Sequence, residues 1–187
     1  MRISGGAARG IVLKIPRGHD FRPATDRLRQ AVFSSLGGRV AGAWFLDLFA
    51  GTGSYGLEAF SRGAAGGWFV EQHRGAVAAL KANIASVSKS SGRSPRDLAA
   101  VCGDALLWTP PPGLKVDLIF VDPPFAQIEA LAESLFRRCA GFIRDVPEAR
   151  LVFQVPGEQE LASPGWRFIR RIGKGRGQPT CCVFAPQ

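Results

Sequence analysis

A carboxylate, two prolines and an aromatic residue close one apolar run of this chain. Asp122, Pro123, Pro124 and Phe125 directly follow residues 116–121, a run that is apolar except for Asp117. An exocyclic amine of a nucleobase is a poor nucleophile because its lone pair is delocalised. Asp122 and a backbone carbonyl held by the two rigid prolines would accept hydrogen bonds from both N–H groups and so localise the lone pair on the nitrogen. Phe125 would stack on the flipped base. The four residues predict methylation of a planar amine, although a strand followed by a proline turn explains the same letters structurally.

A glycine-rich loop and several acids predict the methyl donor. Residues 47–56 contain G-x-G-x-x-G, and acids also stand near the ends of the next predicted strands. Ligands of parallel sheets bind at those ends. Asp47 would repel the pyrophosphate of a nicotinamide dinucleotide by about 1–4 kcal/mol at about 4 Å. S-adenosylmethionine, which carries an ammonium and a sulfonium, is therefore the predicted cofactor.

Each residue of this predicted cofactor site has its own role. Gly51 and Gly53 would let the backbone approach the methionine part, and Asp47 would bind its amino group directly or through water. Glu71 would accept from the ribose hydroxyls and Asp104 from the adenine amine. A helix cap or an exposed strand end is the structural alternative for each acid taken singly.

The elements that would position these residues alternate between strand and helix beyond residue 40. Strands are predicted at 44–48, 67–70, 98–102, 116–121 and 150–155, with helices at 53–61, 74–85 and 128–139 and a polar linker at 86–95. Short buried strands separated by helices predict a mostly parallel sheet covered on both faces. Residues 166–172 and 180–184 predict a closing antiparallel hairpin, and residues 3–15 predict a small N-terminal β-hairpin before a helix capped by Thr25.

Composition favours a polyanionic partner. The 187 residues carry 24 Lys and Arg against 15 Asp and Glu, a formal charge of +9. Cys102, Cys139, Cys181 and Cys182 form no metal-ligand or disulfide pattern, so we expect buried, reduced thiols and no metal. The chain shows no export signal and no membrane span, and we expect a cytoplasmic protein.

The basic residues are concentrated at the N-terminal end, where the first forty residues hold eight Lys and Arg and only two acids. Such a concentration predicts contacts with nucleic-acid phosphates, with Arg2 and Arg9 on the hairpin and Arg22 and Thr25 near the active site. A solvated helix face with paired charges is the alternative. The loop 173–179, with Lys174 and Arg176, is a further candidate for gripping the RNA backbone.

In these motifs the sequence resembles the 16S ribosomal RNA guanine-N2 methyltransferases of the RsmD type. The likeness covers residues 2–6, 8–10, 22–29, 47–59, 61–64, Glu71, Asp104 and 122–125. The resemblance implies a Rossmann-like methyltransferase core at 41–187 with an RNA-binding β-hairpin extension at 1–40. It also implies methyl transfer from S-adenosylmethionine to N2 of a guanine in 16S ribosomal RNA, free or within the small ribosomal subunit.

Three other functions stay open on the sequence. Adenine N6 in DNA or RNA would be methylated by the same residues, because base identity depends on pocket contacts that the motif does not specify. A non-catalytic RNA-binding module of the same fold is disfavoured by the intact acids, which are costly when buried and unpaired. A nicotinamide-dependent oxidoreductase is disfavoured by Asp47. We expect a monomer.

Overall fold

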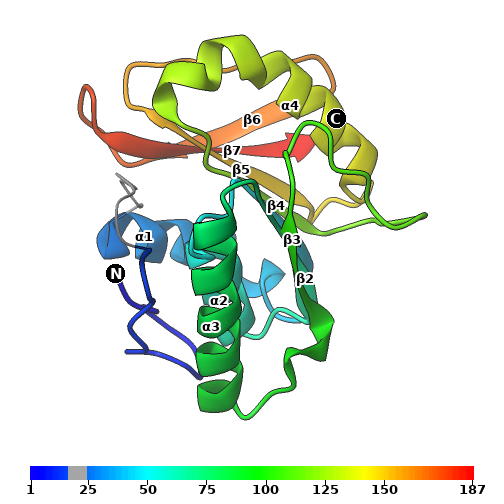
Figure 1. The fold of residues 1–187 in the computed structure, drawn as a ribbon. Helices are drawn as coiled ribbons and strands as arrows, with labels where there is room; N and C mark the ends of the chain where they lie inside the picture. The colour runs from blue at the N-terminus through cyan, green and yellow to red at the C-terminus, as the bar shows by residue number, and fades with distance from the viewer. Residues whose placement is uncertain (17–24) are drawn as a thin grey trace.

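A computed structural model describes residues 1–16 and 25–187, which form one seven-stranded sheet with helices on both faces (Figure 1). The sheet order is β3-β2-β1-β4-β5-β7-β6. The strands are β1 (Trp44–Leu48), β2 (Gly66–Glu71), β3 (Leu98–Cys102), β4 (Leu118–Val121), β5 (Arg150–Pro156), β6 (Trp166–Ile172) and β7 (Pro179–Pro186). The α-helices are α1 (Asp26–Leu36), α2 (Ser54–Ser61), α3 (Arg74–Ser91) and α4 (Ile128–Phe142).

The pairing of the strands confirms the predicted fold class. β1 pairs in parallel with both β2 and β4, β2 with β3, and β4 with β5. The last two strands reverse, since β7 runs antiparallel to both β5 and β6. Continuous apolar strands are buried on both faces, as parallel sheets require. The carboxyl ends of β1, β2, β4 and β5 therefore meet at one edge of the sheet.

Two apolar clusters fill the faces of the sheet. One buries Phe45, Phe69 and Phe120 of the sheet against side chains of α1, α2 and α3, and the other packs Phe136 of α4 against Phe153. Figure 1 shows α4 alone over its part of the sheet, with the other three helices gathered on the opposite side. No helix in the described part of the chain is long and apolar enough to cross a membrane.

The first predicted helix is confirmed and a predicted linker is wrong. The hydroxyl Oγ1 of Thr25 accepts from Leu28 N at 3.1 Å, so Thr25 caps α1 as expected. The predicted linker at 86–95 is instead helical as far as Ser91, and the helix ends at Gly92 with φ 64°. Val87 continues the apolar stripe of the helix and is fully buried, so tertiary packing overrides the poor helix propensity of the serines.

The N-terminal hairpin is short and belongs to the main core. One antiparallel bridge, Arg2 with Val12, joins its arms, and Ile3 N donates to Ile11 O at 2.9 Å. Ile3 and Leu13 are buried in the same cluster as Phe45. The predicted boundary near residue 40 therefore separates elements that share one core.

A buried ionic group, here called the Glu58 cluster, ties this hairpin to α1 and α2; it comprises Ser4, Arg29, Glu58 and Arg62. The carboxylate of Glu58 is fully buried and accepts from Ser4 N at 2.8 Å, Ser4 Oγ at 2.8 Å and Arg62 Nε at 2.7 Å. Arg29, also fully buried, lies 3.5 Å from the same carboxylate and donates to the carbonyl of Arg2. Hydrogen bonds to every buried charge make the cluster a structural clamp.

Candidate active site

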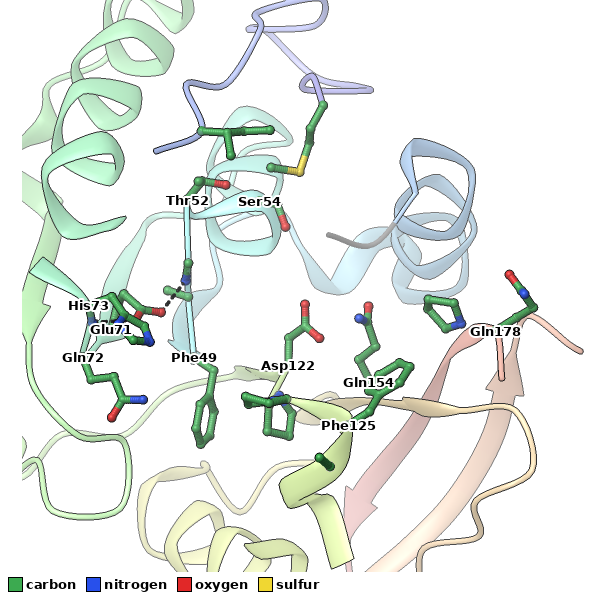
Figure 2. Close-up of a pocket in the computed structure, with 18 of the residues that line it drawn as sticks. Phe49, Thr52, Ser54, Glu71, Gln72, His73, Asp122, Phe125, Gln154 and Gln178 are labelled. Carbon is green, nitrogen blue, oxygen red and sulfur yellow. Dashed lines mark hydrogen bonds between the residues drawn. The ribbon is translucent and has the colours of Figure 1, made fainter. Parts of the chain in front are cut away.

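A cavity of about 680 Å³, here called the site cavity, opens at the edge where the parallel strands end (Figure 2). Pockets of about 300–1,000 Å³ are the size that holds a cofactor or drug-sized ligand. Its lining comes from the ends of β1, β2, β4 and β5, from the loop between β6 and β7, and from the N-terminal hairpin. The lining residues with polar or aromatic side chains are Phe49, Thr52, Ser54, Glu71, Gln72, His73, Asp122, Phe125, Gln154 and Gln178.

The glycine-rich loop after β1 forms one wall of the site cavity. Gly51 and Gly53 have φ values of 55° and 84°, a left-handed conformation that favours glycine. Gly51 lines the cavity, whereas Gly53 caps α2 from behind, where an added Cβ would lie 2.5 Å from Leu80 Cδ1. Phe49 has a φ of 58°, unusual for an aromatic residue, and its strained backbone places its ring on the cavity wall.

Glu71, at the end of β2, is held by the backbone around it. Its Oε2 accepts from Gly51 N at 2.8 Å and its Oε1 from His73 N at 2.8 Å. Figure 2 draws this carboxylate beside the glycine loop. Both oxygens are thus fixed in position and keep lone pairs for a ligand. The arrangement suits recognition of paired hydroxyl groups.

Asp122, just after β4, has the opposite environment. Its carboxylate points into the site cavity and accepts no hydrogen bond from any residue that the structure describes. Burial raises the pKa of Asp122 to about 7. A carboxylate with free lone pairs in this cavity is suited to accept hydrogen bonds from N–H groups of a ligand.

The rest of the motif surrounds Asp122. Pro123, Pro124 and Phe125 all line the site cavity, and Phe125 begins a short 3-10 turn, Phe125–Gln127, that leads into α4. Pro123 is buried while the ring of Phe125 is half-buried. The two prolines hold the backbone extended, so a carbonyl and an aromatic ring lie beside one carboxylate.

Two predicted cofactor acids lie outside the site cavity. Asp47 is buried beneath the loop, where its Oδ2 accepts from Gly56 N at 2.9 Å. Burial is the main reason why the pKa of Asp47 is raised well above its usual value, and the charges of Asp122 and Glu71 add to it. Asp104 is exposed and accepts from Leu106 N at 2.7 Å. In this structure both acids serve local backbone contacts, which were the structural alternatives for them.

The chain matches the family described as Conserved hypothetical protein 95 over residues 1–184. It belongs to this family, the RsmD family. It is 38% identical over 125 residues to the ribosomal RNA small subunit methyltransferase D of Escherichia coli K12, an alignment that covers 67% of this chain and 60% of that relative. The resemblance predicted from the sequence motifs is thereby confirmed.

Solved structures of similar proteins extend over the whole chain. A putative methyltransferase, yhhF, from Escherichia coli has a TM-score of 0.81 at 29% identity and covers 100% of this chain and 98% of its own. A putative methylase from Haemophilus influenzae has a TM-score of 0.74 at 25% identity, over 98% and 97%. The RsmD-family chain therefore has the methyltransferase fold.

Three of the four predicted RNA-contacting residues of this family member, Arg2, Arg9 and Thr25, are described by the structure and lie outside the lining of the site cavity. Arg2 is exposed and forms an ion pair with Asp26 at 3.5 Å, and Arg9 is exposed in the turn between the two arms of the hairpin. Both line a smaller cavity of about 230 Å³ together with Arg27. Thr25 is used as the cap of α1, and Arg22 lies outside the described residues.

Sequence reasoning missed several residues of the site cavity. Gln154 stands inside β5 and is almost fully buried, yet its side chain lines the cavity. Phe49 and Gln178 also line it, and Gln178 comes from the loop between β6 and β7. The signal for Gln154 was present: it is a polar residue in an otherwise apolar strand. Cys102 is exposed, contrary to the expectation of buried thiols, because it ends the edge strand β3.

Proposed function

We propose that this protein transfers a methyl group from S-adenosylmethionine to the exocyclic N2 amine of a guanine in 16S ribosomal RNA. The observation that carries the proposal is the unpartnered carboxylate of Asp122 inside a cavity that also contains Pro123, Phe125 and the glycine loop. Membership of the RsmD family supports both the reaction and the ribosomal substrate.

The residues at the glycine-loop end of the cavity fit the cofactor. Gly51 leaves room beside the backbone, and Glu71 presents two fixed oxygens for the ribose hydroxyls. The two carboxyl groups of Glu71 and Asp122 also favour a cationic ligand in the same cavity. When bound, S-adenosylmethionine supplies an electrophilic methyl group on a sulfonium. Asp47 would act from behind, by holding the first turn of α2 and with it the loop.

The residues at the Asp122 end would prepare the amine. Asp122 and the carbonyl of Pro123 accept its two N–H hydrogens, which localises the nitrogen lone pair toward the methyl group. Phe125 stacks on the base and fixes its plane. The new N–C bond forms as the S–C bond breaks, and the methylated nitrogen releases one proton to Asp122 or to water.

The RNA would approach from the side of the hairpin. Arg2 and Arg9 are proposed to bind phosphates there, with Arg22 and Thr25 closer to the reacting base, in a monomeric, cytoplasmic enzyme. Replacing Arg2 and Arg9 with Ala should weaken binding to ribosomal RNA and reduce the slope of log Kd against log salt by about 0.7–0.9 for each phosphate that the variant no longer neutralises. Fluorescence titrations from low to physiological salt measure this slope, and an unchanged slope would place the RNA surface elsewhere.

A labelled-methyl assay tests the function directly. The protein is incubated with labelled S-adenosylmethionine and, in parallel, small-subunit particles, naked ribosomal RNA and duplex DNA, followed by nucleoside analysis. N2-methylguanosine in the ribosomal samples is the expected result. N6-methyladenine would contradict the base assignment, and cofactor binding without transfer to any substrate would favour a non-catalytic RNA-binding module.

A further inference from the structure

Gln154 is a buried polar side chain of the site cavity that has no role in the proposed reaction so far. Only 2% of Gln154 is exposed. Its carbonyl oxygen Oε1 accepts from the hydroxyl of Tyr55, on α2, at 2.8 Å. Its amide nitrogen donates to no atom in the described part of the chain. A donor that faces the cavity in this way is available to water or to an acceptor atom of a ligand.

The sheet places this amide next to Asp122. Val121 of β4 pairs with Phe153 of β5 in parallel register, so the next residue of each strand is Asp122 and Gln154. Side chains at the same register on neighbouring strands point to the same face. Figure 2 shows both end groups directed into the cavity. A carboxylate acceptor and an amide donor therefore form one adjacent pair.

Tyr55 fixes which end of the amide faces the ligand. Its ring stacks on Phe120 with centroids 5.4 Å apart, and its hydroxyl also lies 3.2 Å from Cys181 Sγ. Burial, together with the nearby Cys181 and Asp122, raises the pKa of Tyr55 well above its usual value, so the phenol keeps its proton. A protonated hydroxyl donating to Oε1 leaves the NH₂ end of Gln154 toward the cavity.

We infer that Gln154 is a base-reading residue whose amide donates to the ring nitrogen beside the reacting amine, while Asp122 accepts from the amine itself. Acceptor and donor together match an amidine edge, a carbon that carries an amine next to an unprotonated ring nitrogen. In guanine this edge is N2 with N3. The inference rests on the proposed function and adds the atom of the base that is recognised.

The test pairs a protein variant with a substrate atom. Wild type and Gln154→Met, which keeps side-chain length and removes the donor, are assayed on small-subunit particles whose RNA carries guanine or 3-deazaguanine at the methylated position. We expect Gln154→Met to lower kcat/KM for guanine particles about 10- to 100-fold. The analogue should lower the wild-type value by the same factor and leave Gln154→Met unaffected. Losses that multiply would overturn the inference.

Controls separate this role from a structural one. Gln159→Met, a matched change outside the site cavity, should keep wild-type kcat/KM. Cofactor affinity and melting temperature of Gln154→Met should stay at wild-type values; a loss of either that accounts for the change in kcat/KM would overturn the inference. Tyr55→Phe should lower kcat/KM in the wild-type background and have no further effect on Gln154→Met. If the wild-type protein transfers methyl groups and Gln154→Met has the same kcat/KM, this inference is wrong but the proposed function stands. If the wild-type protein transfers none, both the proposed function and this inference are wrong.

Discussion

The two ends of the site cavity differ in how far the protein satisfies its own polar groups. At the glycine-loop end, Glu71 receives two backbone hydrogen bonds of 2.8 Å each. At the other end, the Asp122 carboxylate and the Gln154 amide nitrogen have no partner among the described residues. The first end is built before any ligand arrives, and the second is completed by the ligand.

This difference separates binding from chemistry. A carboxylate that binds the ribose, away from the reacting atoms, contributes equally to ground and transition states, and so lowers the dissociation constant without accelerating the reaction. An unsatisfied carboxylate that meets the amine can stabilise the positive charge developing on nitrogen. Under the proposed function, the cofactor binds at the Glu71 end and the Asp122 end provides the rate acceleration.

Removing the Asp122 carboxylate should have the largest effect. Asp122→Ala should lower kcat about 10²- to 10⁴-fold while the dissociation constant of S-adenosylmethionine changes only a few-fold, because the missing interaction forms in the transition state. Single-turnover methyl transfer and calorimetry measure the two quantities. Normal turnover at saturation with a large loss of cofactor affinity would reverse the roles of the two ends.

Removing the Glu71 carboxylate should do the reverse. Glu71→Ala should raise the dissociation constant of S-adenosylmethionine about 10- to 100-fold, as loss of a charge-assisted hydrogen bond costs about 1.5–3 kcal/mol. Turnover at saturating cofactor should fall much less. Glu133→Ala, which removes an exposed acid paired with Arg137, is the matched control. Equal losses of kcat in Glu71→Ala and Asp122→Ala would contradict the proposed division between cofactor binding and rate acceleration.

The pH dependence of kcat/KM should follow the ionisation of Asp122. Since its pKa is raised to about 7 and its ionised form stabilises the positive charge that develops on nitrogen, kcat/KM for RNA should fall about tenfold per pH unit well below the pKa and level off above it. A bound cation lowers that pKa, so the midpoint should move to lower pH at saturating cofactor. Rate profiles at two cofactor concentrations measure the shift. A flat profile between pH 5 and 8 would contradict the assignment.

Ionisation of Asp122 should also change the free energy of unfolding of the ligand-free protein, by less than the effects above. The folded pKa of Asp122, about 7, lies above the ordinary 3.8, so the folded state binds more protons and loses stability as pH rises between these values. Asp122→Asn cannot ionise and should be more stable than wild type by about 1–3 kcal/mol at pH 8. The difference should nearly vanish at pH 4. Urea unfolding at both pH values measures it, and an equal gain at each would indicate a packing effect instead.

The sequence predicted the motif residues better than the isolated acids. Asp122 to Phe125 and Gly51 converge on the site cavity as expected, because strand ends of a parallel sheet meet at one edge. An acid at or near the end of a strand can equally accept a hydrogen bond from nearby backbone, as Asp47 does from Gly56 N and Asp104 from Leu106 N. The role of Gln154 could not be predicted from the residues around it in the sequence, because its hydrogen-bond partner, Tyr55, lies about a hundred residues earlier in the chain.

The Glu58 cluster has a consequence for the choice of target. The carboxylate joins the hairpin, through Ser4, to α2, whose first turn follows the glycine loop. Displacing the hairpin would leave a buried charge without its partners, which is strongly unfavourable. The hairpin that carries Arg2 is therefore held in place relative to the glycine loop of the site cavity. If Arg2 binds a phosphate and Asp122 binds the amine, as proposed, we expect the target guanine to be selected partly by its distance from that phosphate in the folded RNA.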